Sequence, residues 1–496
     1  MLTLFILIPL LTLIGMAFAK DHKQVRLVAA VGMSIQLLQS IVLVFQYLGE
    51  RAAGNTAEML YRTNILWFEQ FNIRYNVGVD GISVALILLT SVVIFAGVFA
   101  SWNVKELAKE FFMSLILLTT GVYGFFISLD MFTMFLFYEI AVIPMYLLIG
   151  IWGSGPKEYS AMKLTLMLMG GSAFLLVGLL GIYFNSDAGG GPLTFDILEI
   201  AKVNIPIDAQ RLFFPLTFLG FGVLGALFPF HTWSPDGHAS APTAVSMLHA
   251  GVLMKLGGYG CLRIATFLMP EAASEMAWIF LILTSISVIY GALGAVVQTD
   301  LKYINAYSSV SHCGLVLFAI LMMNQATFNG AILQMLSHGL ICALFFGLIG
   351  MIYSRSHTRD IYKMGGLMKV MPFLSVCYVI CGFASLGLPG LSGFAAEMPI
   401  FVGAFQEPGT FNTVATVIAV ASIVVTAVYV LRAVAFMLLG PIENEEYHSL
   451  TDAAWHERLS AGILVVAIAG MGLAPLWLSN MIMESMGPIL ERLAGL

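Results

Sequence analysis

The sequence predicts an all-α polytopic membrane protein with about fourteen membrane-spanning helices. Of its 496 residues, 59% are hydrophobic and only 10% are charged, whereas a soluble domain carries roughly 25% charged residues. Apolar stretches of roughly 17 to 25 residues recur along the whole chain, and each is long enough to cross the ~30 Å hydrocarbon core of a bilayer. We therefore predict a single membrane domain over residues 1–496.

Helix positions follow from apolar runs that are bounded by charged residues or by Gly and Pro clusters. The predicted ranges are 3–19, 25–48, 82–101, 111–128, 130–152, 160–184, 212–230, 241–263, 277–298, 303–323, 328–353, 372–405 (broken), 411–438 and 459–480. They divide the domain into N-terminal helices and loops (1–110), a first repeat (111–263), a second repeat (277–438) and a C-terminal loop and helix (439–496). No basic residue precedes the first apolar run, so it is interpreted as a retained helix and not as a signal peptide.

The distribution of charge and the cysteines indicate which partners and metal sites this membrane protein is expected to have. No polar segment is long enough to fold a nucleotide-binding or catalytic domain, and the net charge of -6 is not gathered into a basic patch, so nucleic acid is not expected as a partner. All five cysteines lie in apolar stretches without a C-x-x-C pair. We interpret them as small hydrophobic core residues, with metal or iron-sulfur ligation as the alternative.

The distribution of basic residues predicts the orientation. An even number of spans places both termini on the same side of the membrane. If that side is the outside, the inner loops hold twelve Lys and Arg residues and the outer segments hold six. Because basic residues concentrate on the cytoplasmic side, we predict a bacterial inner-membrane protein with both termini in the periplasm.

Two predicted spans are interrupted by proline, at Pro229 in the seventh and at Pro389 in the twelfth. A broken membrane helix leaves backbone groups that protein or water must satisfy, so it usually lines a polar cavity. A pair of broken helices in two halves of a chain is typical of inverted-repeat transporters. The alternative for either break is a packing kink.

Ionisable residues at membrane depth are the candidate functional groups. Glu139 lies in the middle of the fifth span, Lys255 in the middle of the eighth, and Glu397 follows the break in the twelfth. Burying a charge in a membrane is costly, so such residues usually belong to ion or proton pathways. The alternatives are a hydrogen-bonded structural glutamate and, for Lys255, a side chain that extends to the interface.

Three histidines complete this set: His249 in the eighth span, His312 in the tenth and His338 in the eleventh. Imidazole titrates near pH 6.5, so carboxylates, lysine, histidines and water could relay protons across the centre of the bilayer. Each buried histidine could instead be structural. His312 and His338 could also be axial ligands of a haem.

Several motifs resemble those of the antiporter-like subunits of complex I. Residues 230–243, FHTWSPDGHASAPT, resemble the family signature LHxWLPDAHxxAPT. The other matching segments are 79–83, 298–302, 306–312, 334–339 and 357–360. Within that family the chain is similar to the M-type, or chain 4-type, subunits, because it has the LLKxGGYG-like motif at 253–260 and a glutamate, Glu397, where paralogues generally have lysine.

The resemblance implies a fold and a set of roles. The fold would contain two inverted five-helix repeats, spans 4–8 and 9–13, around a central polar axis. Glu139 would be the carboxylate of a first half-channel with Lys163 near it, and Lys255 the central relay. His312 and His338 would link onward to Glu397, the terminal group.

One position departs from the family pattern. The seventh span usually carries a lysine five residues before the proline that matches Pro229, and here that residue is Leu224. We hypothesise that His249 compensates by turning toward Glu139, because L-type paralogues have a histidine at the corresponding place. The alternative is a first half-channel that is impaired or wired differently.

The function implied by the resemblance is proton translocation in a respiratory NADH:quinone oxidoreductase. The chain would be a non-redox subunit without a cofactor of its own. FMN, iron-sulfur clusters and quinone would belong to partner subunits, and the neighbours would be L- and N-type paralogues and membrane lipids. The rival interpretations are a subunit of a multisubunit sodium/proton antiporter, a subunit of an energy-converting hydrogenase or formate-oxidising complex, and an inactive spacer of the membrane arm.

Overall fold

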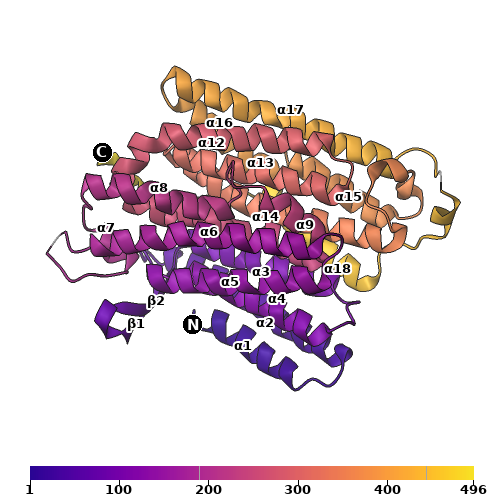
Figure 1. The fold of residues 1–496 in the computed structure, drawn as a ribbon, viewed down its shortest axis with the longest axis horizontal. Coiled ribbons are helices and arrows are strands. Elements are labelled where there is room, and N and C mark those ends of the chain that lie inside the picture. Colours follow the sequence, from indigo (N-terminus) through magenta and orange to yellow (C-terminus); the bar gives the residue numbers. More distant parts are fainter. Residues whose placement is uncertain (189, 443, 496) are drawn as a thin grey trace.

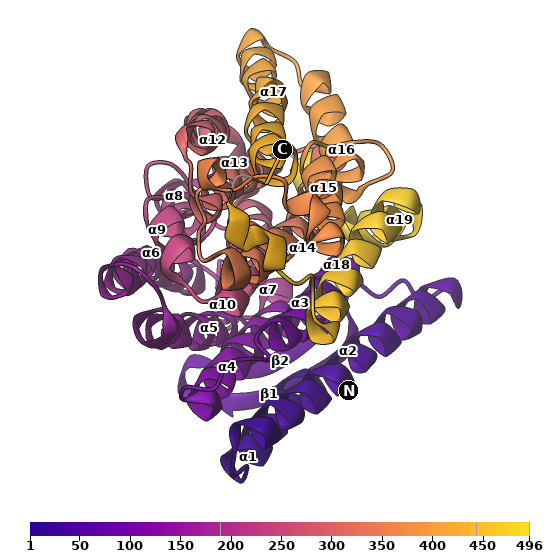
Figure 2. The same cartoon turned by 90° about the vertical axis from the view of Figure 1, so that its right-hand side faces the viewer.

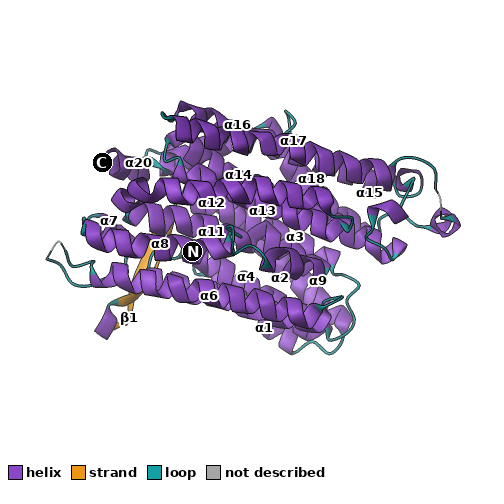
Figure 3. Ribbon diagram, turned by 45° about the horizontal axis from the view of Figure 1, so that its top comes forward, coloured by secondary structure: helices purple, strands orange, loops and turns teal. Residues whose placement is uncertain are grey.

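A bundle of long helices makes up most of the structure (Figures 1 and 3). The computed structural model describes residues 1–188, 190–442 and 444–495. Within these residues, eleven helices are long and apolar enough to cross a membrane, and two shorter apolar helices accompany them. The predicted helical, polytopic membrane fold is confirmed, whereas the number of fourteen spans stays a prediction.

The helices and strands follow one another along the chain with short connections. The first half contains α1 (Leu4–Ala17), α2 (His22–Ala52), β1 (Leu60–Phe68), β2 (Ile73–Val79), α3 (Gly81–Ala100), α4 (Ala108–Ile127), α5 (Met131–Trp152), α6 (Lys157–Phe184), α7 (Ile197–Ala201), α8 (Ile207–Leu224), α9 (Trp233–Ser240), α10 (Thr243–Leu248) and α11 (Met254–Gly260). The second half contains α12 (Pro270–Val297), α13 (Leu301–Leu321), α14 (Gln325–Ser356), α15 (Pro372–Ser385), α16 (Ser392–Gln406), α17 (Thr410–Leu438), α18 (Trp455–Leu473), α19 (Leu476–Ser485) and α20 (Gly487–Ala494). Short 3-10 turns cover Glu69–Phe71, Ile361–Lys363, Leu367–Lys369 and Glu445–Ser449.

The helices at the centre of the bundle differ from those at its edge. Seen from one end, α3 and α14 lie in the middle, while α1, α2 and α17 lie at the periphery (Figure 2). Apolar side chains such as Phe45 on α2 (71% exposed) and Val424 on α17 (70% exposed) point outward from these edge helices. In a membrane this surface faces lipid, so exposed apolar side chains carry no penalty there.

The segment 49–80, predicted as a loop, forms an antiparallel hairpin of β1 and β2. Figure 1 shows the hairpin at one end of the bundle, and both chain termini lie toward the same end. We call this the hairpin end. The hairpin is anchored by the carboxylate of Asp130, which accepts hydrogen bonds from the backbone N–H groups of Arg74 (3.0 Å) and Thr133 (2.9 Å). Polar and charged residues in both strands hid the strand signal in the sequence.

A pH-dependent stability is expected from this anchor. Burial raises the pKa of Asp130 from 3.8 to about 6, so between these values the folded protein holds a proton that the unfolded chain has lost. The charged carboxylate therefore does not destabilise the fold at a pH below the pKa that Asp130 has in the unfolded chain. Its destabilising effect is complete at a pH above the pKa that Asp130 has in the folded protein. It amounts to at most ~3 kcal/mol.

The variant Asp130→Asn removes this titration but retains an oxygen that can cap α5. We expect the thermal midpoint of the variant, relative to the unmodified protein, to rise as the pH is raised from about 4 to about 7. The measurement is thermal unfolding followed by tryptophan fluorescence in detergent. A difference between the two midpoints that does not change with pH would contradict this assignment.

Both predicted breaks are present, and side chains satisfy the backbone around the first. The seventh span begins as α8 at Ile207, ends at Leu224 and resumes as α9 at Trp233, so the predicted range 212–230 is wrong at both ends although its predicted interruption is present. The indole N–H of Trp233 donates to the carbonyl of Val223 (3.1 Å), and the hydroxyl of Ser287 accepts from the N–H of Phe228 (2.7 Å). These contacts replace the backbone bonds that the break removes.

The twelfth span divides into α15 and α16, with Pro389 between them. Gly387 in this break has φ +67°, and a Cβ atom there would lie 2.7 Å from the carboxylate of Glu397. Glycine is therefore required both for the backbone conformation and for the close approach of this carboxylate.

The eighth span is not a regular α-helix. Two π-helical segments, His249–Leu253 and Cys261–Thr266, lie on either side of α11. The predicted range 241–263 located the span but not these segments. In membrane and soluble proteins alike, π segments are frequent at functional sites. The last span, predicted as 459–480, also divides, into α18 and α19 around Ala474 and Pro475.

Matched features in the two halves support the predicted inverted repeat, which stays a prediction. Asp130 caps α5 at the hairpin end, whereas Asp300 caps α13 and pairs with Arg359 in a loop at the opposite end. A Cβ atom on Gly121 would meet the backbone of α5 at 2.5 Å, and one on Gly291 would meet the backbone of α13 at 2.6 Å. The helix pairs α4–α5 and α12–α13 thus pack by the same close backbone approach.

A buried ion pair joins α3 to the second π segment. The carboxylate of Asp80 caps α3 by accepting from the N–H of Ser83 (2.9 Å) and also binds the guanidinium of Arg263. Both side chains are at most 3% exposed. Removing one partner of such a pair leaves an uncompensated buried charge.

Replacing Asp80 with alanine is therefore expected to destabilise the protein by about 3–5 kcal/mol. The measurement is the thermal midpoint in detergent. The matched control is Asp208→Ala, because the Asp208 side chain is 92% exposed and its contact with Arg211 is long (3.4 Å). Equal midpoints for the two variants would show that the Asp80 pair contributes nothing to stability.

Candidate functional site

Four ionisable side chains from four elements form a continuous row inside the bundle. They are Lys255 on α11, His338 on α14, His312 on α13 and Glu397 on α16. Each is at most 9% exposed. We call these four residues the central row. The sequence analysis predicted all four as pathway residues, and the structure brings them together.

Lys255 begins the row. Its Nζ donates to the backbone carbonyl of Ala250, in the first π segment, and lies 2.8 Å from Nδ1 of His338. A buried ammonium requires such acceptors because it has three donors and no acceptor of its own. The side chain points inward, so the alternative of a lysine that reaches the membrane interface is not what the structure has.

His338 and His312 continue the row with their ring centroids 5.3 Å apart. Nδ1 of His338 faces Lys255, and its Nε2 lies 3.0 Å from the thiol sulfur of Cys342. Since both ring nitrogens of His338 have protein partners, the pair does not fit the alternative of axial haem ligation. Nδ1 of His312 lies 3.1 Å from the side-chain amide nitrogen of Gln334.

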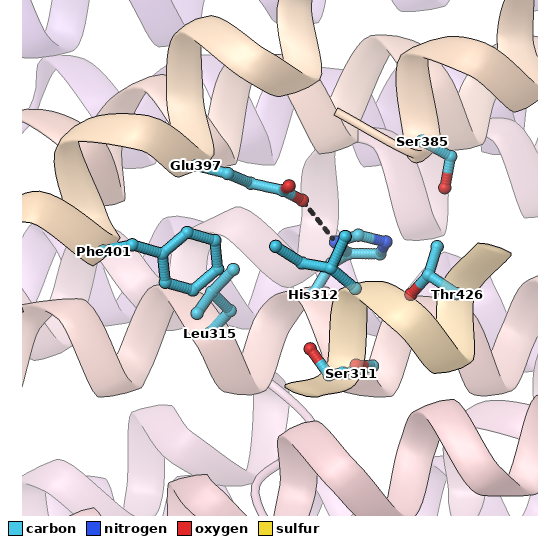
Figure 4. A pocket seen from close by; sticks show the side chains of 9 residues that line it. Ser311, His312, Leu315, Ser385, Glu397, Phe401 and Thr426 are labelled. Atoms are coloured by element: carbon cyan, nitrogen blue, oxygen red, sulfur yellow. Dashed lines mark ion pairs between the residues drawn. The ribbon is translucent and has the colours of Figure 1, made fainter. Parts of the chain in front are cut away.

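Glu397 ends the row beside a small enclosed cavity. Its carboxylate lies 3.6 Å from Nδ1 of His312, and Figure 4 shows the two side chains facing each other across the cavity. The cavity measures about 10 Å³, which is close to the space that one water molecule needs. The hydroxyl-bearing residues among its lining are Ser311, Ser385, Ser422 and Thr426. Hydroxyls and a carboxylate around a water-sized space are groups that can pass a proton.

Among the described residues of the first half of the chain, Glu139 is not part of a comparable row. Glu139 lies on α5 beside the hydroxyl of Ser172, and its buried Oε1 has no hydrogen-bond partner among the described residues. Leu224, which occupies the position of the expected lysine, is fully buried at the end of α8. In the described part of the chain, Glu139 forms no ion pair.

Lys163 pairs with an acid that the sequence analysis did not single out. Its Nζ lies 2.7 Å from the carboxylate of Asp236 on α9, and the other oxygen of Asp236 lies 3.3 Å from the hydroxyl of Tyr303 on α13. The partner of Lys163 is therefore Asp236 and not Glu139. Asp236 lies inside the matched motif, but only the fold could show that α9 meets α6 and α13.

His249 does not turn toward Glu139 as hypothesised. Its ring stacks on Trp233 with centroids 5.1 Å apart and contacts the ring of His238 at 4.4 Å. The nitrogens of His238 and His249 have no hydrogen-bond partner within the described residues. His238 was missed as a candidate although it belongs to the motif at 230–243, because its helix could not be placed beside His249 from sequence alone.

Lys302 is a further buried cation that the sequence analysis assigned to a loop. It is 5% exposed, and its Nζ donates to the carbonyl of Ala241 (2.6 Å), between α9 and α10. Its position two residues after Asp300, the cap of α13, made it resemble an interfacial charge.

The fold and the central row define a polytopic helical membrane protein with a buried row of ionisable groups. Residues 128–426 match the family described as "NADH:quinone oxidoreductase/Mrp antiporter, TM". The chain is 38% identical over 473 residues to NAD(P)H-quinone oxidoreductase chain 4-2 of Synechocystis sp., covering 93% of this chain and 83% of that protein. It is 34% identical over 479 residues to NADH-quinone oxidoreductase subunit M of Rickettsia prowazekii, covering 96% and 95%.

Solved structures have the same fold. A chain of respiratory complex I from Thermus thermophilus aligns with a TM-score of 0.90 at 23% identity, covering 99% of this chain and all of that one. A chain of the Mrp complex from Dietzia sp. aligns with a TM-score of 0.84 at 20% identity, covering 99% and 98%. The chain belongs to the NADH:quinone oxidoreductase/Mrp antiporter transmembrane family.

Proposed function

We propose that this chain is the M-type, antiporter-like subunit of a respiratory NADH:quinone oxidoreductase and that it moves protons across the membrane. The observation that carries the proposal is the central row, four ionisable groups from four helices at membrane depth. The names of its relatives, subunit M and chain 4 at 34–38% identity, support the assignment to this complex.

The proton path in this proposal runs along the central row. Lys255 holds a proton between Ala250 and His338, and the two histidines pass it toward Glu397 and the hydroxyl-lined cavity. Burial makes each group's protonation sensitive to a neighbouring charge, so a change in one ion pair can load or release a proton.

The ionisable residues of the first half-channel pair differently from the family pattern. Glu139 contributes a carboxylate without a lysine partner, while Lys163 is held by Asp236 and His249 by Trp233 and His238. This arrangement is supported by Leu224, which offers no charge to Glu139.

The chain carries out no electron transfer in this proposal. FMN, iron-sulfur clusters and quinone belong to partner subunits, and the L- and N-type paralogues and membrane lipids adjoin this subunit. Both termini face the periplasm of a bacterial inner membrane, because that orientation places twelve basic residues inside against six outside.

The test is purification of the tagged protein from its native membrane in mild detergent, followed by mass spectrometry and assays of NADH:quinone activity and proton pumping. We expect flavin and iron-sulfur subunits together with L- and N-type paralogues. Recovery of hydrogenase subunits, or of small antiporter subunits alone, would contradict the complex I assignment. A complex that pumps normally with Lys255→Ala would contradict the proton path.

A further inference from the structure

The hydroxyl of Ser309 and the thiol of Cys342 lie on the side of His338 that faces away from Lys255. Ser309 on α13 lies 3.1 Å from the sulfur of Cys342, and that sulfur lies 3.0 Å from Nε2 of His338. All three side chains are at most 2% exposed. The central row as described above assigns no role to Ser309 or Cys342.

The direction of each hydrogen bond in this group follows from counting protons. The hydroxyl of Ser309 donates to the carbonyl of Asn305 (3.0 Å), which uses its one proton. Its contact with Cys342 must then be one in which the thiol donates and the hydroxyl oxygen accepts. The thiol has a single proton too, so toward His338 its sulfur can only accept.

The tautomer of His338 is fixed as a result. Nε2 must carry the hydrogen that it donates to Cys342, which leaves Nδ1 of the neutral ring without one. Nδ1 is the atom that lies 2.8 Å from Nζ of Lys255. An Nδ1 atom without a hydrogen can accept from the ammonium of Lys255. In the opposite tautomer, the Nδ1–H group and the ammonium would be two donors facing each other.

We propose that Cys342 and Ser309 are positioning residues that hold His338 in the Nε2–H tautomer, so that its Nδ1 receives the proton of Lys255. In this step an Nζ–H bond breaks and an Nδ1–H bond forms, which converts ammonium and neutral imidazole into amine and imidazolium. The inference rests on the proposed proton path and adds the residues that orient one transfer within it.

The other groups that face His338 are compatible with this assignment. The titratable side chains around its ring are Lys255 from α11, His312 and Cys313 from α13, Cys342 from its own helix and, further away, His238 from α9. The sulfur of Cys313 lies 3.9 Å from Nδ1. A thiol at this place can donate weakly to a bare Nδ1, so it does not oppose the Nε2–H tautomer.

The test compares variants of the intact complex in proteoliposomes, with proton pumping and quinone reduction measured from about pH 6 to about pH 9. Cys342→Val keeps a small apolar side chain, with one additional branch at Cβ, but removes the hydrogen bonds, and Cys342→Ser keeps a group that both accepts and donates. Ser309→Ala frees the thiol proton for Nε2 and favours the wrong tautomer. Cys377→Ala, a buried thiol on α15 outside the central row, is the control.

We expect Cys342→Val and Ser309→Ala to slow pumping about five-fold, as the loss of one net hydrogen bond predicts, and to shift its pH profile in the same direction. Cys342→Ser and Cys377→Ala should behave like the unmodified complex. The inference is overturned if Cys342→Ser is as slow as Cys342→Val, or if the slow variants keep the original pH profile, because either result would mean a packing role.

The variant Lys255→Ala in the same assay separates this inference from the proposed function. If Lys255→Ala pumps normally, the proton path itself is wrong. If Lys255→Ala does not pump but Cys342→Val does so at the normal rate and pH, the path stands and the tautomer assignment falls. Assembly of each variant is verified by native gel, and Cys342→Val avoids the cavity that alanine would leave.

Discussion

Replacing Lys255 with alanine is expected to abolish proton pumping through this subunit and to slow coupled quinone reduction by about 100-fold, the scale of a lost proton-transfer group. The side chain holds the only amine in the central row, between Ala250 and His338. Without it, the donor that remains at Nδ1 of His338 among the described residues is the distant thiol of Cys313. The measurement is the pH gradient formed in proteoliposomes during NADH oxidation.

The variant Lys255→Arg sharpens this prediction. A guanidinium keeps the positive charge but does not release its proton in proteins. If Lys255 acts by exchanging a proton, arginine should pump as poorly as alanine; if the residue supplies only a fixed charge, arginine should restore pumping. The matched control is Lys202→Ala, because the Lys202 side chain is 68% exposed and its ammonium pairs with Glu199, outside the central row.

Replacing Glu397 with glutamine is expected to reduce pumping at least about ten-fold while the complex remains assembled. Glutamine has nearly the same shape and can still face His312 and the Gly387 turn, but it cannot take up a proton. The variant therefore removes titration with little change in packing. Proton release, followed with a pH dye after a short pulse of NADH, is the direct measurement.

Two further variants define what the Glu397 result means. Glu397→Asp retains a titratable group on a shorter side chain, so it should recover part of the activity. Glu407→Gln is the control, because Glu407 lies just after α16 and accepts from the side chain of Asn324 (2.7 Å) outside the central row. Normal pumping by Glu397→Gln would remove this residue from the path.

Most of the fold could be predicted from the sequence because the bilayer imposes a simple rule. Helices must be apolar over a known length, and charges within them are rare enough to name, so Lys255, His338, His312 and Glu397 could be identified one by one. The breaks near Pro229 and Pro389 were predictable for the same reason, since proline interrupts the backbone hydrogen bonds of a helix.

The remaining features depend on contacts between distant segments. The π segments that flank α11 have no propensity signature, because their extra residue is stabilised by packing against neighbouring helices. The pair of Lys163 and Asp236 joins residues 73 positions apart, and Cys342 meets Ser309 from a different helix. The stacking of His249 on Trp233, which replaced the hypothesised contact with Glu139, likewise required the position of α9.

The carbonyl of Ala250 gives Lys255 a hydrogen-bond acceptor from within its own span, the eighth, and not from a neighbouring helix. It belongs to the same helix as Lys255 and lies in the π segment just before it, so the ammonium carries part of its solvation shell with it. Lys255 therefore has one hydrogen-bond acceptor that does not depend on the position of His338. In the proposed proton path, the eighth span therefore supplies one acceptor for the proton that Lys255 holds, while the residue that receives this proton, His338, lies on α14.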